Sequence, residues 1–253
     1  MSIKKPSFEI IRQLIPPLSH EFHKGQAGRI CIVGGSEDYT GAPYFSAYSA
    51  LKLGADLSHV LCHPSASTAI KVKKDDEGGD DDNSKLKENV MEKINSLSLS
   101  RFHVIVVGPG LSRDKIMFEC AKSVILKAKK DNLPIVIDAD ALTLVQSQPE
   151  LIKNYSRAVL TPNVNEFKRF CEKMDIGISD DDKEYAIKKL SLALGGVTII
   201  QKGHNDLISN GDKVFVVDND GGLKRCGGQG DILSGLVGTF LSWGASYKNK
   251  LWE

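Results

Sequence analysis

Short apolar runs alternate with longer segments of helical periodicity along most of the chain. The run at residues 29–33 (RICIV) is rich in β-branched residues and ends in two glycines, which is typical of a buried strand followed by a turn. Segment 42–53 instead repeats its apolar side chains at helical spacing. The pattern predicts strands at residues 29–33, 57–62, 103–107, 134–137, 157–160 and 197–201, a hairpin at residues 206–209 and 213–217, and helices at residues 42–53, 114–130, 164–171, 182–194 and 231–243.

Most of these strands are apolar throughout and are separated by helices. A parallel sheet with helices on both faces requires this pattern, because both surfaces of each strand are buried. We therefore expect an α/β fold, a three-layer domain with a mostly parallel central sheet that residues 1–253 form as one unit. The acidic run at residues 75–82 (DDEGGDDD) breaks the pattern and lacks the spacing of a calcium loop. It predicts an acidic surface insertion over residues 75–85.

The charge and composition of the chain exclude several classes of protein. Lys and Arg number 33 against 32 Asp and Glu, so the basic excess of a nucleic-acid-binding domain is missing. No apolar run approaches the roughly 20 residues of a membrane span, and the first residues resemble no targeting signal. The five cysteines are dispersed without a Cys-x-x-Cys pair, as expected in a reducing compartment. These features predict a cytoplasmic protein that binds neither nucleic acid nor membrane.

The most informative motif is the glycine-rich segment that leads into the last predicted helix. In residues 227–231 (GGQGD) the glycines leave backbone N–H groups free to point at an anion, and the helix dipole adds positive potential. Asp231 suits a base that takes the proton from a hydroxyl being phosphorylated, although a simple N-cap role explains the same residue. The glycine turn at residues 108–110 lacks the third glycine of a dinucleotide fingerprint, and the sequence contains no Walker loop.

A second motif opens the helix predicted at residues 164–171. Asn163 and Glu166 are three positions apart in the first helical turn, so their side chains face the same side. Their oxygens suit a hydrated Mg²⁺, which needs only one or two carboxylates. A capping box, with Asn163 as the cap and Glu166 reaching back to it, also explains the pair. Both roles stay open on the residues alone.

The two motifs together resemble the signature pair of the ribokinase-like superfamily, N-x-x-E followed by a G-x-G-D helix start. Residues 23–70, beginning HKGQAGRICIVGGSEDYTGAPYF, are similar to the opening of one of its families, the eukaryotic ATP-dependent NAD(P)H-hydrate dehydratases. The blocks VVGPGLSRD, PIVIDADAL, LTPNVNEFKRF, QKGHNDLI and RCGGQGDILSG follow in the order of that family. The resemblance covers most of residues 20–244. Ser112 departs from it, because a glycine is expected at that position.

The resemblance implies a ribokinase-like fold and a repair reaction on small molecules, hydrated NADH or NADPH and ATP. ATP would phosphorylate the C6 hydroxyl of the hydrated ring, phosphate would leave, and NADH or NADPH would be restored. Asp231 would be the catalytic residue, ATP the co-substrate and Mg²⁺ the cofactor, with Glu166 as its candidate ligand. The residues implied to contact the hydrated nucleotide are Gly110, Asn163, Val164, Asn165, Glu166, Phe167, Lys168, Arg169 and Asp231. Those implied to surround ATP are Lys202, Gly203, His204, Asn205, Asp206, Gly221, Gly222, Leu223, Lys224, Arg225, Cys226, Gly227, Gly228, Gln229 and Gly230.

Two other functions fit the same motifs, a small-molecule kinase of the same superfamily and a non-catalytic nucleotide-binding protein. The second is considered because relatives are expected to continue for several helical turns beyond the end of this chain. Part of the last predicted helix would then be uncovered, and a homo-oligomer would be one way to bury it. The apolar residues concerned are Leu233, Leu236, Val237, Phe240 and Leu241.

Overall fold

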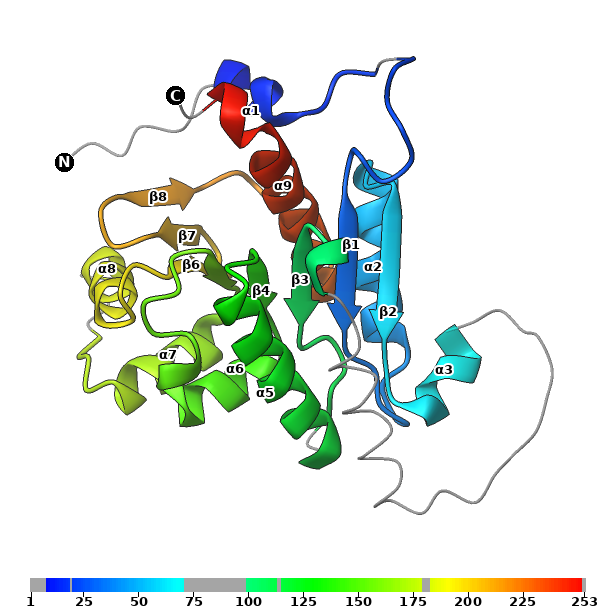
Figure 1. Ribbon diagram of the computed structural model, residues 1–253. Helices are drawn as coiled ribbons and strands as arrows, with labels where there is room; N and C mark the ends of the chain where they lie inside the picture. The colour runs from blue at the N-terminus through cyan, green and yellow to red at the C-terminus, as the bar shows by residue number, and fades with distance from the viewer. Residues whose placement is uncertain (1–7, 19, 71–98, 113–114, 179–182, 252–253) are drawn as a thin grey trace.

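The computed structural model describes residues 8–18, 20–70, 99–112, 115–178 and 183–251. Within these ranges an eight-stranded sheet runs through the molecule in the order β2-β1-β3-β4-β5-β6-β7-β8 (Figure 1). Neighbouring strands from β2 to β6 are parallel, and β7 and β8 extend the sheet as an antiparallel hairpin. The predicted α/β fold with a mostly parallel sheet is confirmed. The acidic insertion predicted at residues 75–85 lies outside the described residues.

Each strand predicted from the sequence is confirmed to within one residue at either end. The strands are β1 (Arg29–Val33), β2 (Leu57–Leu61), β3 (Val104–Val107), β4 (Ile135–Ile137), β5 (Ala158–Leu160), β6 (Thr198–Gln201), β7 (Asp206–Ser209) and β8 (Val214–Val217). The helices are α1 (Phe8–Leu14), α2 (Gly41–Leu53), α3 (Pro64–Ile70), α5 (Lys115–Lys130), α6 (Asp140–Ser147), α7 (Val164–Lys173), α8 (Lys183–Ala193) and α9 (Gln229–Leu251), with 3-10 turns η1 (Leu99–Arg101) and η2 (Pro149–Leu151).

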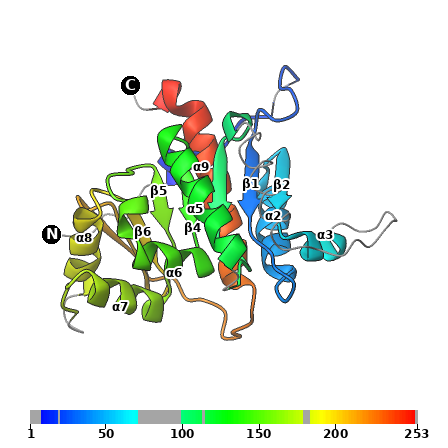
Figure 2. The same cartoon turned by 60° about the horizontal axis from the view of Figure 1, so that its bottom comes forward.

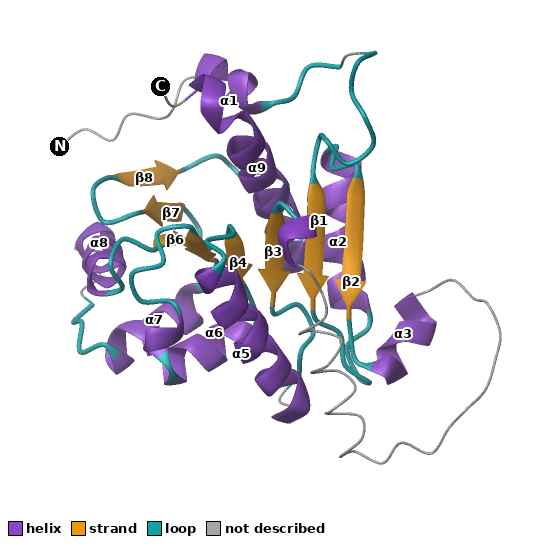
Figure 3. Ribbon diagram, viewed as in Figure 1, coloured by secondary structure: helices purple, strands orange, loops and turns teal. Residues whose placement is uncertain are grey.

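Alternate side chains of the strands build two cores, one on each face of the sheet. On one face, Ile105, Val107 and Ile137 pack in a large cluster with residues of α5, α6, α7 and α8. On the other face, Ile32 and Val106 pack with residues of α2 and α9. Figures 2 and 3 show the strands between these two helix layers. The three predicted layers are therefore present.

Helices α1, α3 and α6 were not predicted, and α9 is longer than the predicted helix at residues 231–243. Helix α6 follows β4 after only two residues, Asp138 and Ala139, which leaves no separate loop between the two elements. The chain turns between them at Ala139, whose φ of 46° is uncommon for a residue with a side chain. This break depends on tertiary packing and leaves no glycine or proline signal in the sequence.

Helix α9 lies along the second face of the sheet. The five apolar residues that were expected to be partly uncovered are all half-buried, and Val237 and Leu241 pack against the second core. An apolar groove of about 590 Å³ remains beside the helix, with Val159, Ile200 and Phe240 in its lining. None of the described helices, including the 23-residue α9, has the length and apolar character needed to cross a membrane.

Candidate active site

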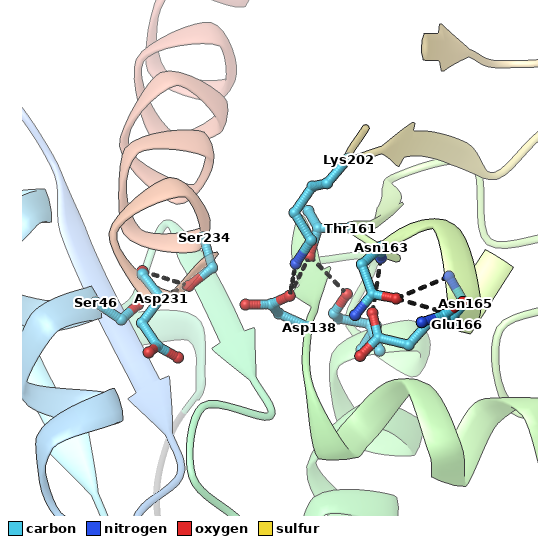
Figure 4. Close-up of polar contacts among 10 residues, drawn as sticks. Ser46, Asp138, Thr161, Asn163, Asn165, Glu166, Lys202, Asp231 and Ser234 are labelled. Atoms are coloured by element: carbon cyan, nitrogen blue, oxygen red, sulfur yellow. Dashed lines mark hydrogen bonds and ion pairs between the residues drawn. The ribbon is translucent and has the colours of Figure 1, made fainter. Parts of the chain in front are cut away.

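The loops after β1, β3, β4, β5 and β6 meet at the carboxyl edge of the parallel strands, the edge where α/β proteins bind ligands. The first two loops touch through a hydrogen bond of 3.0 Å from the Gly35 N–H to the Pro109 carbonyl. Gly108 lies so close to β4 that an added Cβ would be 1.7 Å from the Asp138 carbonyl oxygen. The first turn of α9 faces the same edge (Figure 4). Segments far apart in the sequence thus meet at this edge, and we call the region between Asp138, Lys202 and Asp231 the cleft (Figure 4).

Asp138, directly after β4, is the most deeply buried charged residue of this cleft, with 1% of its surface exposed. Its Oδ1 accepts hydrogen bonds from Thr161 Oγ1 at 2.6 Å and from Lys202 Nζ at 2.9 Å. Among the described residues its Oδ2 has no hydrogen-bond partner, and it lies on the side of the carboxylate that faces Asp231 (Figure 4). A buried oxygen without a partner is costly, so the cleft offers an acceptor that a ligand can use.

Asp231 is held in place by hydrogen bonds between α2 and α9. Ser234 Oγ donates to the Asp231 carbonyl at 2.8 Å and lies 3.0 Å from Ser46 Oγ. Ser49 Oγ donates to the Ile232 carbonyl at 3.1 Å. Because Ser46 and Ser234 are fully buried, their contacts fix the first turn of α9 and with it the Asp231 backbone.

The carboxyl group of Asp231 is tuned by its surroundings. Its pKa is raised to about 6, first by burial and then by the neighbouring Asp138 and Asp140 carboxylates, while Lys202 and a backbone hydrogen bond lower it. A carboxyl group whose pKa lies near the working pH is suited to general-base catalysis. The raised pKa of Asp231 is therefore consistent with a role as general base.

The Asn163–Glu166 pair forms the capping box considered from the sequence. Asn163 Oδ1 accepts from the N–H groups of Asn165 and Glu166, both at 3.0 Å, and Glu166 Oε2 accepts from the Asn163 N–H at 2.7 Å. These contacts start α7 at the carboxyl end of β5. Within the described part of the chain no group of three or more His, Cys, Asp or Glu side chains is arranged to hold a metal.

The residues predicted to surround ATP lie in two places. Lys202 enters the cleft, and its Nζ would be 3.3 Å from a Cβ added at Gly230. The turn that follows is closed by a hydrogen bond of 2.8 Å from the Gly203 N–H to Asp206 Oδ1. Segment 221–227 is exposed, and Gly228, with a φ of 89°, packs against the ring of Phe45. The glycine-rich loop thus approaches the cleft only at its last residues.

Gly110 lies against the start of α2, where an added Cβ would be 3.2 Å from the Ala42 Cβ. Its φ is 66°, and an added Cβ would be 2.6 Å from the Tyr39 carbonyl oxygen, so only glycine fits. Ser112, where a glycine was expected, also has a positive φ of 59°. Its N–H donates to Asp140 Oδ2 at 2.8 Å, which joins this loop to the start of α6.

The structure therefore brings together Lys202, Gly230 and Asp231 and leaves other predicted contacts apart. Phe167 is 2% exposed and packs in the large core, so its side chain anchors α7. Leu223 is fully exposed, and the other residues of segment 221–227 are also exposed.

Sequence reasoning missed the residues that organise the cleft, Asp138, Thr161 and Asp140. Each follows an apolar run that was predicted to be a strand. In a parallel sheet, polar residues directly after strands gather at the carboxyl edge. The position of these polar residues after strands could have identified them as site candidates. It does not show which of their side chains contact one another.

The fold is that of the ribokinase-like proteins. A ribokinase-like superfamily protein from Enterococcus faecalis superimposes with a TM-score of 0.72 at 25% identity, over 94% of this chain and 79% of that one. The ADP/ATP-dependent NAD(P)H-hydrate dehydratase from Bacillus subtilis, co-crystallised with ATP and Mg²⁺, gives a TM-score of 0.68 at 20% identity, over 96% of this chain and 82% of that chain.

The sequence comparisons define the family more narrowly. The NAD(P)H-hydrate dehydratase family profile matches residues 30–252. An ATP-dependent (S)-NAD(P)H-hydrate dehydratase from Phaeosphaeria nodorum is 42% identical over 261 residues, covering 99% of this chain and 79% of the relative. The chain belongs to the NAD(P)H-hydrate dehydratase family, as its sequence motifs predicted.

Proposed function

We propose that this protein catalyses the ATP-dependent dehydration of the S epimer of hydrated NADH or NADPH, which restores the reduced nucleotide and releases ADP and phosphate. Family membership supports this reaction. The observation that carries it at the level of residues is the Asp231 carboxyl group. It lies at the glycine-rich start of α9 with a pKa raised to about 6, in the same cleft as Lys202.

Asp231 is proposed to take the proton from the C6 hydroxyl of the hydrated ring as that oxygen attacks the γ-phosphorus of ATP. The C6 hydroxyl is a poor leaving group, and phosphorylation converts it into a good one. The ring nitrogen then expels phosphate, and loss of a C5 proton restores the double bond. The raised pKa makes Asp231 a stronger base than an exposed aspartate.

Lys202 and the first turn of α9 are proposed to bind the phosphates. An ammonium group and backbone N–H groups at a helix N-terminus both stabilise the negative charge that moves during phosphoryl transfer. Arg225, in the exposed segment before α9, would add charge once ATP is bound. Gly110 and residues 163–169 are proposed to contact the hydrated nucleotide, and Asn163 lies beside Lys202 through an isolated β-bridge.

Mg²⁺ is proposed as the cofactor, with Glu166 as its protein ligand. The donor chemistry fits, because Mg²⁺ prefers carboxylate, water and phosphate oxygens and needs only one or two carboxylates from the protein. The bound ion would neutralise charge on the ATP phosphates. The B. subtilis protein of the same fold was co-crystallised with ATP and Mg²⁺, which supports the choice of ion.

Product analysis tests the proposal against a small-molecule kinase. Purified protein is incubated with the S hydrate of NADH, ATP and Mg²⁺, and the products are separated and quantified. We expect NADH, ADP and free phosphate in equal amounts. A stable phosphorylated hydrate would assign the protein to the kinases, and ATP binding without any product would contradict catalysis altogether.

A further inference from the structure

Lys202, the lysine proposed to bind ATP, forms an ion pair with a side chain of the protein itself. Its Nζ donates to Asp138 Oδ1 at 2.9 Å. Asp138 is 1% exposed, whereas 23% of the Lys202 side chain is accessible. ATP therefore meets an ammonium group that is paired with a buried carboxylate.

The contacts of the pair allow Lys202 to leave without stranding Asp138 Oδ1. That oxygen also accepts the Thr161 hydroxyl at 2.6 Å, and Thr161 is itself fully buried. Lys202 Nζ is close to Gly230, where a Cβ would lie 3.3 Å away, so the flexible lysine chain has only a short way to move to reach phosphates at the start of α9. A lysine side chain has several rotatable bonds and makes such a movement easily.

We propose that Asp138 is a positioning residue that holds Lys202 until ATP binds, and that ATP binding transfers Lys202 from Asp138 to the phosphates. This inference rests on the proposed role of the cleft in binding ATP. It assigns to Asp138 a function that the sequence motifs did not suggest. The exchange also changes the charges around Asp231.

The charged groups that face Asp231 come from three elements besides its own helix. Asp138 follows β4, Asp140 begins α6, and Lys202 follows β6; the carboxylates favour protonation of Asp231 and the lysine opposes it. When Lys202 is drawn to the phosphates and its charge is neutralised there, the two carboxylates dominate. Asp231 then becomes a stronger base at the moment when the phosphoryl donor is in place.

A double-mutant cycle on ATP affinity tests the exchange. Binding of ATP with Mg²⁺ is measured by calorimetry for wild type, Asp138→Asn, Lys202→Met and the double variant. We expect Asp138→Asn to bind ATP roughly 3- to 10-fold more tightly, because no ion pair has to be broken. The gain should vanish when Lys202 is also replaced, since Asp138 acts through that lysine.

The cycle separates the exchange from a general charge effect. Removing any carboxylate near the phosphates also strengthens ATP binding, because it removes charge repulsion. That general effect would persist in the Lys202→Met background and would also appear in Asp140→Asn. Either result, or an Asp138→Asn protein that binds ATP no better than wild type, would overturn the proposal. Because ATP binding is measured without turnover, failure of the dehydratase reaction would leave this test intact.

A pH profile distinguishes a positioning role from a purely structural one. In Asp138→Asn the acidic limb of the pH–rate profile should move to lower pH. The kcat should fall, although ATP binds more tightly. A merely structural defect would weaken binding and leave the limb where it is. A limb that does not move therefore contradicts the proposal.

Wild-type protein supplies a measurement that does not depend on the folding of Asp138→Asn. If ATP binding strengthens Asp231 as a base, the protein takes up protons when ATP with Mg²⁺ binds near pH 6, the region in which this carboxyl group titrates. Calorimetry in buffers of different ionisation enthalpy reports this uptake, with Asp231→Asn as the control. Uptake in wild type that is lost in the control supports the exchange, and equal uptake in both proteins refutes it.

Discussion

Ser46 Oγ on α2 lies 3.0 Å from Ser234 Oγ on α9, although the two residues are 188 positions apart in the sequence. Ser234 Oγ also donates to the Asp231 carbonyl, so this contact ties α2 to the turn that carries the proposed base. The helices approach this closely because Gly235 has no side chain. A Cβ there would lie 2.1 Å from the Ser46 carbonyl oxygen. The position of Asp231 thus depends on packing between two distant segments.

Gly235→Ala should destabilise the protein and displace Asp231. The added methyl group has to push α9 away from α2, at a cost of about 1–3 kcal/mol. Denaturant unfolding measures this cost, and turnover should fall with it. Gly244→Ala in the same helix is the matched control, because a Cβ there meets nothing within 4 Å and should leave stability unchanged or raise it by up to ~1 kcal/mol. Equal effects of the two substitutions would contradict the packing argument.

Asp231→Asn should raise thermal stability in neutral solution. The folded protein holds the Asp231 proton more tightly than the unfolded chain, since its pKa is raised from 3.8 to about 6. Stability contributed by this group is therefore complete below the unfolded pKa and is lost as the pH rises through the folded one. The variant should melt at a higher temperature than wild type above pH 6, and the difference should close below pH 3.8. A variant that is less stable than wild type at neutral pH would show that the carboxylate stabilises the fold.

Glu166→Gln should raise the Mg²⁺ concentration needed for half-maximal turnover. A glutamine at this position still accepts the Asn163 N–H and preserves the capping box, so the melting temperature should change little. Glu166→Ala is the comparison, because it removes both the cap contact and the proposed ligand. A Glu166→Gln protein with an unchanged Mg²⁺ titration would leave capping as the function of this carboxylate.

Ser112→Gly should stabilise the loop after β3. Ser112 has a φ of 59°, which costs a residue with a side chain about 1 kcal/mol or more relative to glycine. Its backbone N–H donates to Asp140 Oδ2, and because that donor does not depend on the side chain of residue 112, the hydrogen bond is kept in the variant. Gly110→Ala is the reverse change in the same loop and should be destabilising, because its Cβ would lie 2.6 Å from the Tyr39 carbonyl oxygen. Denaturant midpoints compare the two, and a loss of stability in Ser112→Gly would refute the strain argument.

Most of the strands could be predicted from the sequence because they are short, mainly apolar runs bounded by glycine or polar residues. Helix α6 could not, since the turn at Ala139 has a positive φ that no glycine announces. The length of α9 was underestimated because the pattern beyond Trp243 is no longer periodic in apolar residues. Local patterns locate the elements, and packing decides where they end.

Sequence analysis identified those parts of the candidate site whose residues are close together in the sequence. Asp231 and the glycines before it form one local motif, and the Asn163–Glu166 capping box forms another. The role of Asp138 depends on Lys202, which is 64 residues away. No spacing rule joins two such positions, because only the strand order places the ends of β4 and β6 on the two sides of β5.

The central claim is that this protein uses ATP to restore NADH or NADPH from the S hydrate and that Asp231 is the base. The most direct measurement is the recovery of the near-ultraviolet absorbance of reduced nicotinamide, with the S hydrate, ATP and Mg²⁺ supplied to wild type and to Asp231→Asn. We expect wild type to restore the absorbance only when ATP is present, and Asp231→Asn to bind ATP but to turn over at least ~10²-fold more slowly. No recovery by the wild-type protein, or full activity in Asp231→Asn, would contradict the claim.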